Sequence, residues 1–192
     1  MAQDCKVLSE KRIENFKPLV MSEFDAKNHC TLASITAILN YYGTIGMSSI
    51  PKDPDKIFAS VKDVAIKNSY YFPVLGTPTI FIPKIIKKVW RSFFYNGTAV
   101  NKLFFKNEEA IVNEFVEELE AERPLILSLA DGRYKNHSVT VYGYRLVEIG
   151  GKRELVGIVN DNWSLSEKYI NISKLGKLSS SLFIMSKLAP FR

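Results

Sequence analysis

The pattern of apolar and polar positions predicts two helices early in the chain. Residues 31–43 place branched apolar side chains at helical spacing, and Gly43 supplies a C-terminal stop. Small residues fill the positions between them, as in a helix that is buried on most sides. Asp53 and Pro54 provide a cap and a first-turn proline for the second helix, which is predicted to run to about Asn68.

Two further helices are predicted in the first half of the chain. One lies within 80–94, where the early Pro83 indicates either a kink or a start at that point. The other covers 108–122, follows a capping Asn107 and begins with acidic residues, which the positive end of the helix dipole favours. A short strand is predicted at 102–105. The residues expected to face inward are Ile82, Ile85, Ile86, Val89 and Trp90 in the first of these helices, and Ile111, Phe115, Val116 and Leu119 in the second.

The pattern changes to that of β-strands in the second half of the chain. Residues 125–130 form a continuous apolar run of strand length, and residues 137–149 alternate between apolar and polar side chains. Gly150-Gly151 then turns the chain, so 152–161 is predicted to return as an antiparallel partner. Two more strand candidates lie at 167–175 and 181–188.

Helices followed by antiparallel strands predict an α+β fold. We expect a helical N-terminal lobe, about 1–122, packed on an antiparallel, barrel-like C-terminal sheet, about 123–192. The chain has 192 residues, of which 46% are hydrophobic and 24% are charged, as is typical of one globular domain. This composition excludes a disordered chain, a coiled coil and a fibrous repeat. Since no repeat or Gly/Ser linker divides the sequence, we expect a single domain over 1–192.

The formal net charge of +6 indicates a basic surface, which either suits acidic partners or only keeps the protein soluble. The first residues contain no apolar signal-peptide core, and no apolar run approaches the roughly 18 residues that span a bilayer. We therefore expect a cytoplasmic protein with no membrane partner. In that reducing compartment Cys5 and Cys30 are expected to be free thiols.

Cysteine and histidine are scarce, which limits the chemistry that the chain can perform. The chain has two cysteines, Cys5 and Cys30, and two histidines, His29 and His137. Their spacing does not match that of a zinc finger or zinc ribbon. The sequence also lacks a phosphate-binding loop and a Gly-x-Ser-x-Gly nucleophile elbow. We therefore predict no metal and no cofactor.

One cysteine, one histidine and one aspartate lie at element ends where a catalytic group would lie. Cys30 directly precedes the buried helix, and the free N–H groups of a helix N-terminus favour a thiolate. His137 begins the long alternating strand, and Asp161 ends the return strand. A hairpin around Gly150-Gly151 brings those two ends together if a small bulge or a longer loop absorbs the difference in length. The pattern is that of a nucleophile, a base and an orienting acceptor.

Each of these residues also has a plainer structural interpretation. A lone cysteine is usually a small buried apolar residue, a lone histidine is usually structural, and Asp161 suits a turn. The order, the element types and the hairpin register agree for all three residues, which favours the catalytic interpretation. His29 is expected to be exposed or at the lip of the site, because adjacent helical residues point in different directions. Cys5 is expected to be incidental.

These segments resemble those of papain-like cysteine peptidases, and the pattern is most similar to the bacterial bacteriocin-leader, or double-glycine, peptidases. Residues 28–34, continuing to the Asn-Tyr-Tyr-Gly at 40–43, are similar to the cysteine helix of that family. Residues 124–128 followed by 137–144 are similar to its histidine strand. The Val-Asn-Asp-Asn-Trp at 159–163 resembles its Asn-Asp-Pro-Trp-like segment and also the Asn-Ser-Trp segment of papain.

The resemblance implies a role for each matching residue. Cys30 would be the nucleophile, His137 the general base and acid, and Asp161 the orienting residue. Trp163 would shield the histidine and aspartate from water, although core packing explains a tryptophan equally well. The fold implied is that of a papain-like peptidase.

The chain departs from the family pattern at the oxyanion hole. The family carries a glutamine shortly before the cysteine, and the corresponding position here is Phe24. Asn28 is the nearest side-chain amide and is therefore the oxyanion candidate. The family also has glycine after the cysteine, where this chain has Thr31. A missing oxyanion donor lowers the rate by ~10²–10³-fold and does not abolish activity.

The implied activity is hydrolysis of a peptide or amide bond through an acyl-enzyme, with a peptide or protein as substrate. Two alternatives stay open. One is an acyl or peptidyl transferase on the same fold. The other is a catalytically degenerate module that binds acidic peptides or nucleic acid, of which nucleic acid is the less favoured partner. The basic residues that such a module would use are Lys84, Lys87, Lys88 and Arg91. The sequence does not predict an oligomeric state.

Overall fold

The computed structural model describes residues 5–103, 108–130, 132–175 and 183–191. Its helices and strands, in chain order, are β1 (Cys5–Arg12), α1 (Cys30–Thr44), α2 (Pro54–Lys67), α3 (Ile82–Ser92), β2 (Asn96–Leu103), α4 (Glu108–Glu120), β3 (Leu125–Leu129), β4 (His137–Ile149), β5 (Lys152–Asn160), β6 (Lys168–Asn171), α5 (Ile172–Leu175) and β7 (Phe183–Phe191). Short 3-10 turns occupy Met21–Glu23, Thr79–Phe81 and Gly132–Tyr134.

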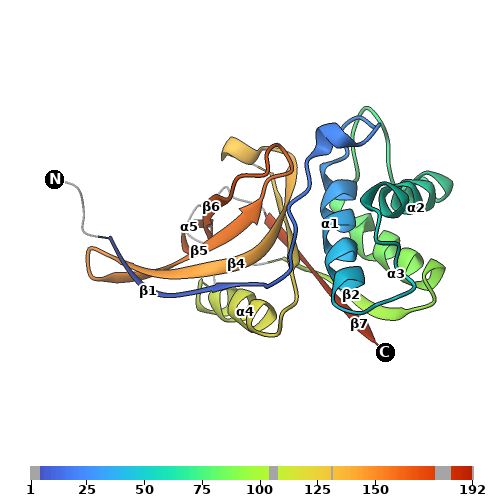
Figure 1. Cartoon of the computed structure of the whole chain (residues 1–192). Helices are drawn as coiled ribbons and strands as arrows, with labels where there is room; N and C mark the ends of the chain where they lie inside the picture. The colour runs from blue at the N-terminus through green and yellow to red at the C-terminus, as the bar shows by residue number, and fades with distance from the viewer. Residues whose placement is uncertain (1–4, 104–107, 131, 176–182, 192) are drawn as a thin grey trace.

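The helices and the sheet form two packed layers that meet at α1. Figure 1 shows α1, α2 and α3 grouped on one side of the molecule, and most of the sheet, with α4 against it, on the other. Helix α1 contacts α2 on one side, and β3 and β4 on the other. The α+β class predicted from the sequence is confirmed. One cluster of buried apolar side chains extends through the helices and the sheet.

The sheet is antiparallel and open. Its strands follow the order β2-β7-β3-β4-β5-β6, and β1 pairs with the second half of β4. Over the described residues β2 and β6 remain the outer strands, so the expected barrel-like closure does not occur. The reason is that β2 and β7 run toward the helical group and pack against α3, away from β6 (Figure 1).

The expected boundary between a helical part, 1–122, and a β part, 123–192, needs correction. The first half of the chain contributes β1, β2 and α4 to the sheet layer. Strand β1 runs antiparallel to β4, with Arg12 opposite Gly143. Its side chains are almost all exposed, so it has no alternation for a sequence pattern to reveal. The strand expected at 102–105 begins earlier, at Asn96.

The β4–β5 hairpin forms as the sequence predicts. Gly150 and Gly151 make its two-residue turn with φ angles of 57° and 75°, a conformation that favours glycine. The register shifts between Val141 and Gly143, which is the bulge expected from the unequal arm lengths. A Cβ on Gly143 would lie 2.6 Å from the carbonyl oxygen of Lys11, so this glycine lets β1 pass close to the bulge. The hairpin thereby brings the start of β4 beside the end of β5.

Helix α1 is the most buried element of the helical group. Every residue from 31 to 42 is buried, as the small and apolar composition predicts. The helix does not stop at Gly43 and continues to Thr44. The left-handed φ of 119° lies instead at Gly46, two residues after the last helical turn. The N-terminal residue of the helix is Cys30.

The other helices follow the predicted pattern closely. The Asp53 carboxylate caps α2 by accepting a hydrogen bond from the Asp55 amide at 3.0 Å. Helix α3 starts at Ile82 with Pro83 in its first turn, so the early proline marks a start and not a kink. In α4 the predicted inward residues are buried except Val116, which is half-buried. The cap predicted at Asn107 lies outside the described residues.

The predicted strand at 167–175 is shorter than expected. It consists of β6 over four residues and then continues as the short helix α5. The candidate at 181–188 corresponds to β7, which pairs with both β2 and β3. In the part of the chain that the structure describes, no helix has the length and apolar character to cross a membrane.

Candidate active site

Cys30 is the first residue of α1 and lines a cleft of about 710 Å³. The residue before it, His29, makes no side-chain cap, and the positive end of a helix dipole favours an anion such as a thiolate. One wall of the cleft is a loop that includes Val74 and Leu75, and the other is the segment around His137. Cys30 is therefore half-buried at the junction of helix and sheet, with access to the cleft.

His137 is the first residue of β4 and lines the same cleft as Cys30, and each of the two side chains shifts the pKa of the other. Its Nε2 lies 2.7 Å from the backbone carbonyl oxygen of Asp161. A carbonyl only accepts, so Nε2 carries the proton of this bond and Nδ1 is left for Cys30. The ring is buried, with only 7% of the residue exposed. The structure thus brings together the cysteine and the histidine that the sequence singled out.

The surroundings of the pair shift both pKa values in opposite directions. Burial raises the pKa of the Cys30 thiol, but the hydrogen bond from His137, the charge of that ring, and donors on Ser138 and Thr31 lower it below its ordinary value. Burial lowers the pKa of His137, but the hydrogen bond and charge of Cys30 and the contacts with Asp161 raise it above its ordinary value. Together these shifts favour a thiolate beside an imidazolium.

Asp161 reaches the histidine ring through its main chain. The carbonyl oxygen accepts from the ring, while carboxylate Oδ1 accepts from the amides of Trp163 at 3.0 Å and Ser164 at 3.2 Å. The carboxylate therefore caps the turn after β5 and acts on His137 only through its charge. Asp161 is therefore both a turn residue, through its carboxylate, and a partner of the histidine, through its carbonyl.

Trp163 and Tyr134 cover the His137 ring. The centroid of the Trp163 ring lies 4.3 Å from that of His137, with an angle of 31° between the planes. The Tyr134 ring is stacked on His137 at 6.0 Å and contacts Trp163 at 5.3 Å. Trp163 itself is 47% exposed, so it lies between the ring and solvent and is not a core residue. Tyr134 lies in a short 3-10 turn before the strand and was not predicted from the sequence.

Asn162 was also missed, although it ties the site together. Its side chain is fully buried, and Nδ2 donates to the Ser34 hydroxyl at 2.9 Å, the Ser138 carbonyl at 3.1 Å and the Cys30 carbonyl at 3.3 Å. One amide thus joins the start of α1 to the start of β4. Its φ of 61° is a conformation that asparagine tolerates well. The sequence signal for this role of Asn162 is its position between Asp161 and Trp163.

The expected oxyanion role of Asn28 needs correction. Both Nδ2 hydrogens are engaged, because Nδ2 donates to the Pro73 carbonyl at 2.9 Å and the Val74 carbonyl at 3.0 Å. The side chain therefore pins the cleft-lining loop and does not point a free donor at Cys30. Phe24, at the position of the family glutamine, is buried and stacks on Phe58 with a centroid separation of 4.3 Å. Neither of these two side chains supplies a free amide donor to the cleft.

His29 differs from its expected position at the lip of the site. It is 4% exposed, its Nε2 hydrogen-bonds with the Met21 carbonyl at 3.0 Å, and its ring packs edge-on against Phe24 and Phe58. Cys5 is a free, exposed thiol on β1. Among the described residues, no three His, Cys, Asp or Glu side chains gather in a group that could hold a metal ion.

The comparisons with known proteins agree with this fold. The sequence model of the Peptidase_C39 like family matches residues 13–181. No curated protein matches the sequence. Among solved structures, UfSP from C. elegans is similar over 96% of this chain and 34% of its own length, with a TM-score of 0.53 and 10% sequence identity. The chain thus spans about a third of that protein, and the likeness shows a shared fold.

The family match includes the cysteine helix, the histidine strand and the segment that ends at Trp163. It covers far more than half of the 192 residues, and it agrees with the papain-like resemblance and fold drawn from the sequence. The chain therefore belongs to the Peptidase_C39 like family.

Proposed function

We propose that this chain hydrolyses peptide or amide bonds through an acyl-enzyme. Cys30 is the nucleophile, His137 is the acid and base, and Asp161 holds the histidine ring. The observation that carries the proposal is that Cys30, at a helix N-terminus, lines one cleft with His137, whose Nε2 is held 2.7 Å from the Asp161 carbonyl oxygen. The family match supports a cysteine peptidase in general, and the substrate is a peptide or protein.

Acylation begins from the thiolate–imidazolium pair. The Cys30 sulfur attacks the carbonyl carbon, so the C–S bond forms and the carbonyl π electrons move to the oxygen. When the tetrahedral intermediate collapses, the C–N bond breaks and the proton on Nδ1 of His137 passes to the leaving nitrogen. The products of this step are a free amine, a thioester on Cys30 and a neutral imidazole.

Deacylation returns the proton to the histidine. Nδ1 of neutral His137 takes a proton from water while the water oxygen attacks the thioester carbon. The C–S bond then breaks, and the sulfur leaves as a thiolate beside the imidazolium. Throughout, the Asp161 carbonyl holds Nε2–H in place, and Trp163 keeps bulk water from that face of the ring.

Selective alkylation tests the proposal without a known substrate. Iodoacetamide at neutral pH, followed by mass spectrometry of the digested protein, compares Cys30 with Cys5 in the same sample. We expect Cys30 to react faster in the wild type and to slow down in His137→Ala, with Cys5 unchanged as the internal control. Equal, slow labelling of both thiols would contradict the proposal.

Turnover of a quenched-fluorescence peptide library then tests the reaction itself. We expect cleavage by the wild type and by Cys5→Ser, and none by Cys30→Ala. Analysis of the products with and without an added primary amine separates hydrolysis from acyl transfer, because a transferase yields the amide of the added amine. Salt-dependent peptide binding that persists in Cys30→Ala, without any cleavage by the wild type, would favour the binding module instead.

A further inference from the structure

The side-chain amide of Asn162 lies between the segment that carries the nucleophile and the segment that carries the base. Its Nδ2 donates to the Cys30 carbonyl at 3.3 Å, at the start of α1, and to the Ser138 carbonyl at 3.1 Å, on the residue after the catalytic histidine. It also donates to the Ser34 hydroxyl at 2.9 Å, about one helical turn after Cys30. No part of Asn162 is exposed. The amide therefore joins the two reacting segments from inside the protein.

The partners of the amide identify its two polar atoms. A backbone carbonyl only accepts, so the group that faces the Cys30 and Ser138 carbonyls is the NH₂ group. Oδ1 is buried and has no hydrogen-bond partner among the described residues. An unpaired buried acceptor destabilises a fold. What the Asn162 side chain contributes is therefore the set of bonds that its nitrogen makes.

The main chain of Asn162 helps to hold the third group of the site. The Asp161 carbonyl, which accepts from Nε2 of His137 at 2.7 Å, belongs to the peptide unit that leads into Asn162. Because a peptide unit is planar, the direction of this carbonyl depends on where the Asn162 backbone lies. The residue that ties Cys30 to β4 thus also fixes the acceptor of the histidine ring.

A second path of hydrogen bonds closes around the nucleophile. The Asn162 carbonyl accepts from the Met21 amide at 2.7 Å. The Met21 carbonyl accepts from Nε2 of His29 at 3.0 Å. His29 is bonded covalently to Cys30, whose own carbonyl accepts from the Asn162 side chain. Cys30 is therefore held on two sides, and both paths end at Asn162.

This tie is a feature of the chain itself. Asn162 stands where the Asn-Asp-Pro-Trp-like segment of the family has proline, which has no side-chain donor. The ring of proline also fixes φ near −65°, whereas the φ of Asn162 is 61°. Neither the side-chain bonds nor this backbone conformation is available to a proline at this place.

We propose that Asn162 is a positioning residue, whose amide fixes the start of α1 against the start of β4 and so sets the separation of Cys30 and His137. This inference rests on the proposed function. The attraction between a thiolate and an imidazolium weakens with distance, so a looser tie makes the thiolate less stable. Attack by the sulfur and proton transfer by His137 depend on the same separation. Substrate binding does not, because the buried amide cannot touch a substrate.

The pH dependence of Cys30 alkylation tests this role in the resting enzyme. Asn162→Gly removes the amide, adds no charge and tolerates the positive φ. We expect the alkylation midpoint to move to higher pH. Ser34→Ala removes the hydroxyl and leaves both carbonyl bonds of Asn162, so its shift should be smaller. Asn15→Gly, the same substitution at an exposed residue with a φ of 62°, is the matched control and should not move the midpoint.

Turnover of the peptide that the wild type cleaves best tests the same role during the reaction. We expect Asn162→Gly to lower kcat by about 10²-fold, the effect of a displacement of about 1 Å, with little change in KM. Ser173→Ala, which removes a buried 2.9 Å hydrogen bond from the Leu155 amide outside the site, is the control for lost stability. It should lower the free energy of unfolding and leave kcat and the alkylation midpoint at their wild-type values.

The wild type carries the test if Asn162→Gly does not fold. NMR of the Asn162 side-chain amide should show slow exchange of its hydrogens with solvent. Its proton shifts should change with pH at the midpoint of Cys30 alkylation, because the amide is bonded to both reacting segments. Fast exchange, or shifts that do not follow this midpoint, would overturn the positioning role.

The outcomes separate this proposal from the proposed function. If Cys30 of the wild type reacts far faster than Cys5 and Asn162→Gly changes neither the midpoint nor kcat, the positioning role is overturned while the peptidase stands. A loss that Asn15→Gly or Ser173→Ala shares, or a change in KM alone, equally overturns it. If Cys30 of the wild type reacts no faster than Cys5, the proposed function itself fails.

Discussion

At the residue scale, Cys30 and His137 each begin an element, and this position governs how they ionise. A residue at the start of α1 meets free N–H groups, and a residue at the start of β4 borders the cleft while its ring is buried. Neither of these positions alone would stabilise the half-buried thiolate of Cys30, because burial raises the pKa of a thiol. The contact between the two side chains reverses that effect.

The contact of Asp161 with the ring predicts a mild effect of Asp161→Asn. The substitution keeps the carbonyl that holds His137 and an oxygen that can cap Trp163 and Ser164, so it removes only the charge. We expect kcat on a cleaved peptide to fall by about tenfold, the equivalent of one pKa unit, and not by the ~10⁴-fold that follows where a carboxylate itself holds the ring. A loss of that larger size would show that the carboxylate turns to the ring during catalysis.

The sequence predicts the position of a residue correctly where that position follows from the end of an element. Cys30 and His137 could be placed because a helix start and a strand start are visible in the pattern. The direction of a side chain is not visible there, so Asn28 was expected at the oxyanion hole and His29 at the surface. Instead, the Asn28 amide donates to the Pro73 carbonyl, and the His29 ring hydrogen-bonds with the Met21 carbonyl. Both partners lie in other segments of the chain, so a local sequence pattern does not reveal them.

At the element scale, strongly amphipathic segments were predictable and exposed strands were not. Helices α2 and α3 carry a cap or first-turn proline and a clear apolar face, and the β4–β5 hairpin carries its turn and alternation. Strand β1 is held by backbone pairing to β4, with side chains that face solvent. Since pairing of this kind leaves no periodicity in the side chains, the sequence pattern could not reveal it.

The loop from Phe72 to Gly76 depends on Asn28, which yields a prediction at this scale. The loop closes on itself through the Phe72 and Gly76 backbones, and the Asn28 amide then ties it to the start of α1. Asn28→Gly keeps the tolerance of the φ of 49° and removes both donors without adding a charge beside Cys30. We expect faster hydrogen exchange at the amides of Leu75 and Gly76, measured by NMR or mass spectrometry, and a higher KM.

The same variant distinguishes pinning of the loop from an oxyanion role. Because the thiol is not in contact with the lost donors and no charge is added, the alkylation rate of Cys30 should stay that of the wild type in Asn28→Gly. Asp53→Ala, which removes the cap of the neighbouring helix α2, is a control for general loosening of the helical group. Unchanged exchange together with a fall of about 10²-fold in kcat would return Asn28 to the oxyanion hole.

At the scale of the whole molecule, the N-terminal segment fastens the two layers together. After β1 leaves the edge of β4, the chain passes to the cleft, where the Leu19 amide donates to Asn160 at 3.1 Å and the Met21 amide to the Asn162 carbonyl at 2.7 Å. It then enters α1 at Cys30. The geometry of the nucleophile therefore depends on a segment that crosses from sheet to helix, and this long-range path is not visible in local sequence patterns.

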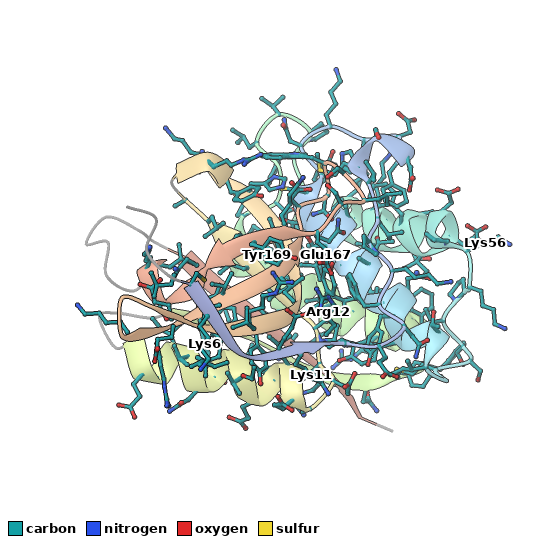
Figure 2. The ribbon with its side chains drawn as sticks, turned by 60° about the vertical axis from the view of Figure 1, so that its left-hand side comes forward. Lys6, Lys11, Arg12, Lys56, Glu167 and Tyr169 are labelled. Carbon is teal, nitrogen blue, oxygen red and sulfur yellow. The ribbon has the colours of Figure 1, made fainter. Side chains whose placement is uncertain are left out.

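One ion-pair cluster anchors the start of that segment and predicts how stability depends on pH. Arg12, at the end of β1, forms two hydrogen bonds with Glu167 before β6, at 2.8 and 3.1 Å, and Tyr169 donates to the same carboxylate at 2.9 Å (Figure 2). The hydrogen bonds from Arg12 and then Tyr169 lower the pKa of Glu167 to about 2. A carboxyl whose pKa is lower in the folded state stabilises the fold above its unfolded pKa, and that contribution disappears as the pH falls toward 2.

Glu167→Gln removes this contribution and so predicts a pH-dependent difference from the wild type. At pH 7 we expect the free energy of unfolding to fall by about 1 kcal/mol, the upper range for a partly exposed pair. The difference should shrink below about pH 4 and vanish near pH 2, where the wild-type carboxyl is also protonated. Urea titrations at several pH values measure it, and Asp63→Asn, which breaks the exposed Asp63–Lys67 pair, is the control with a smaller effect. A difference that persists unchanged at pH 2 would mean that Glu167 acts through packing and not through its charge.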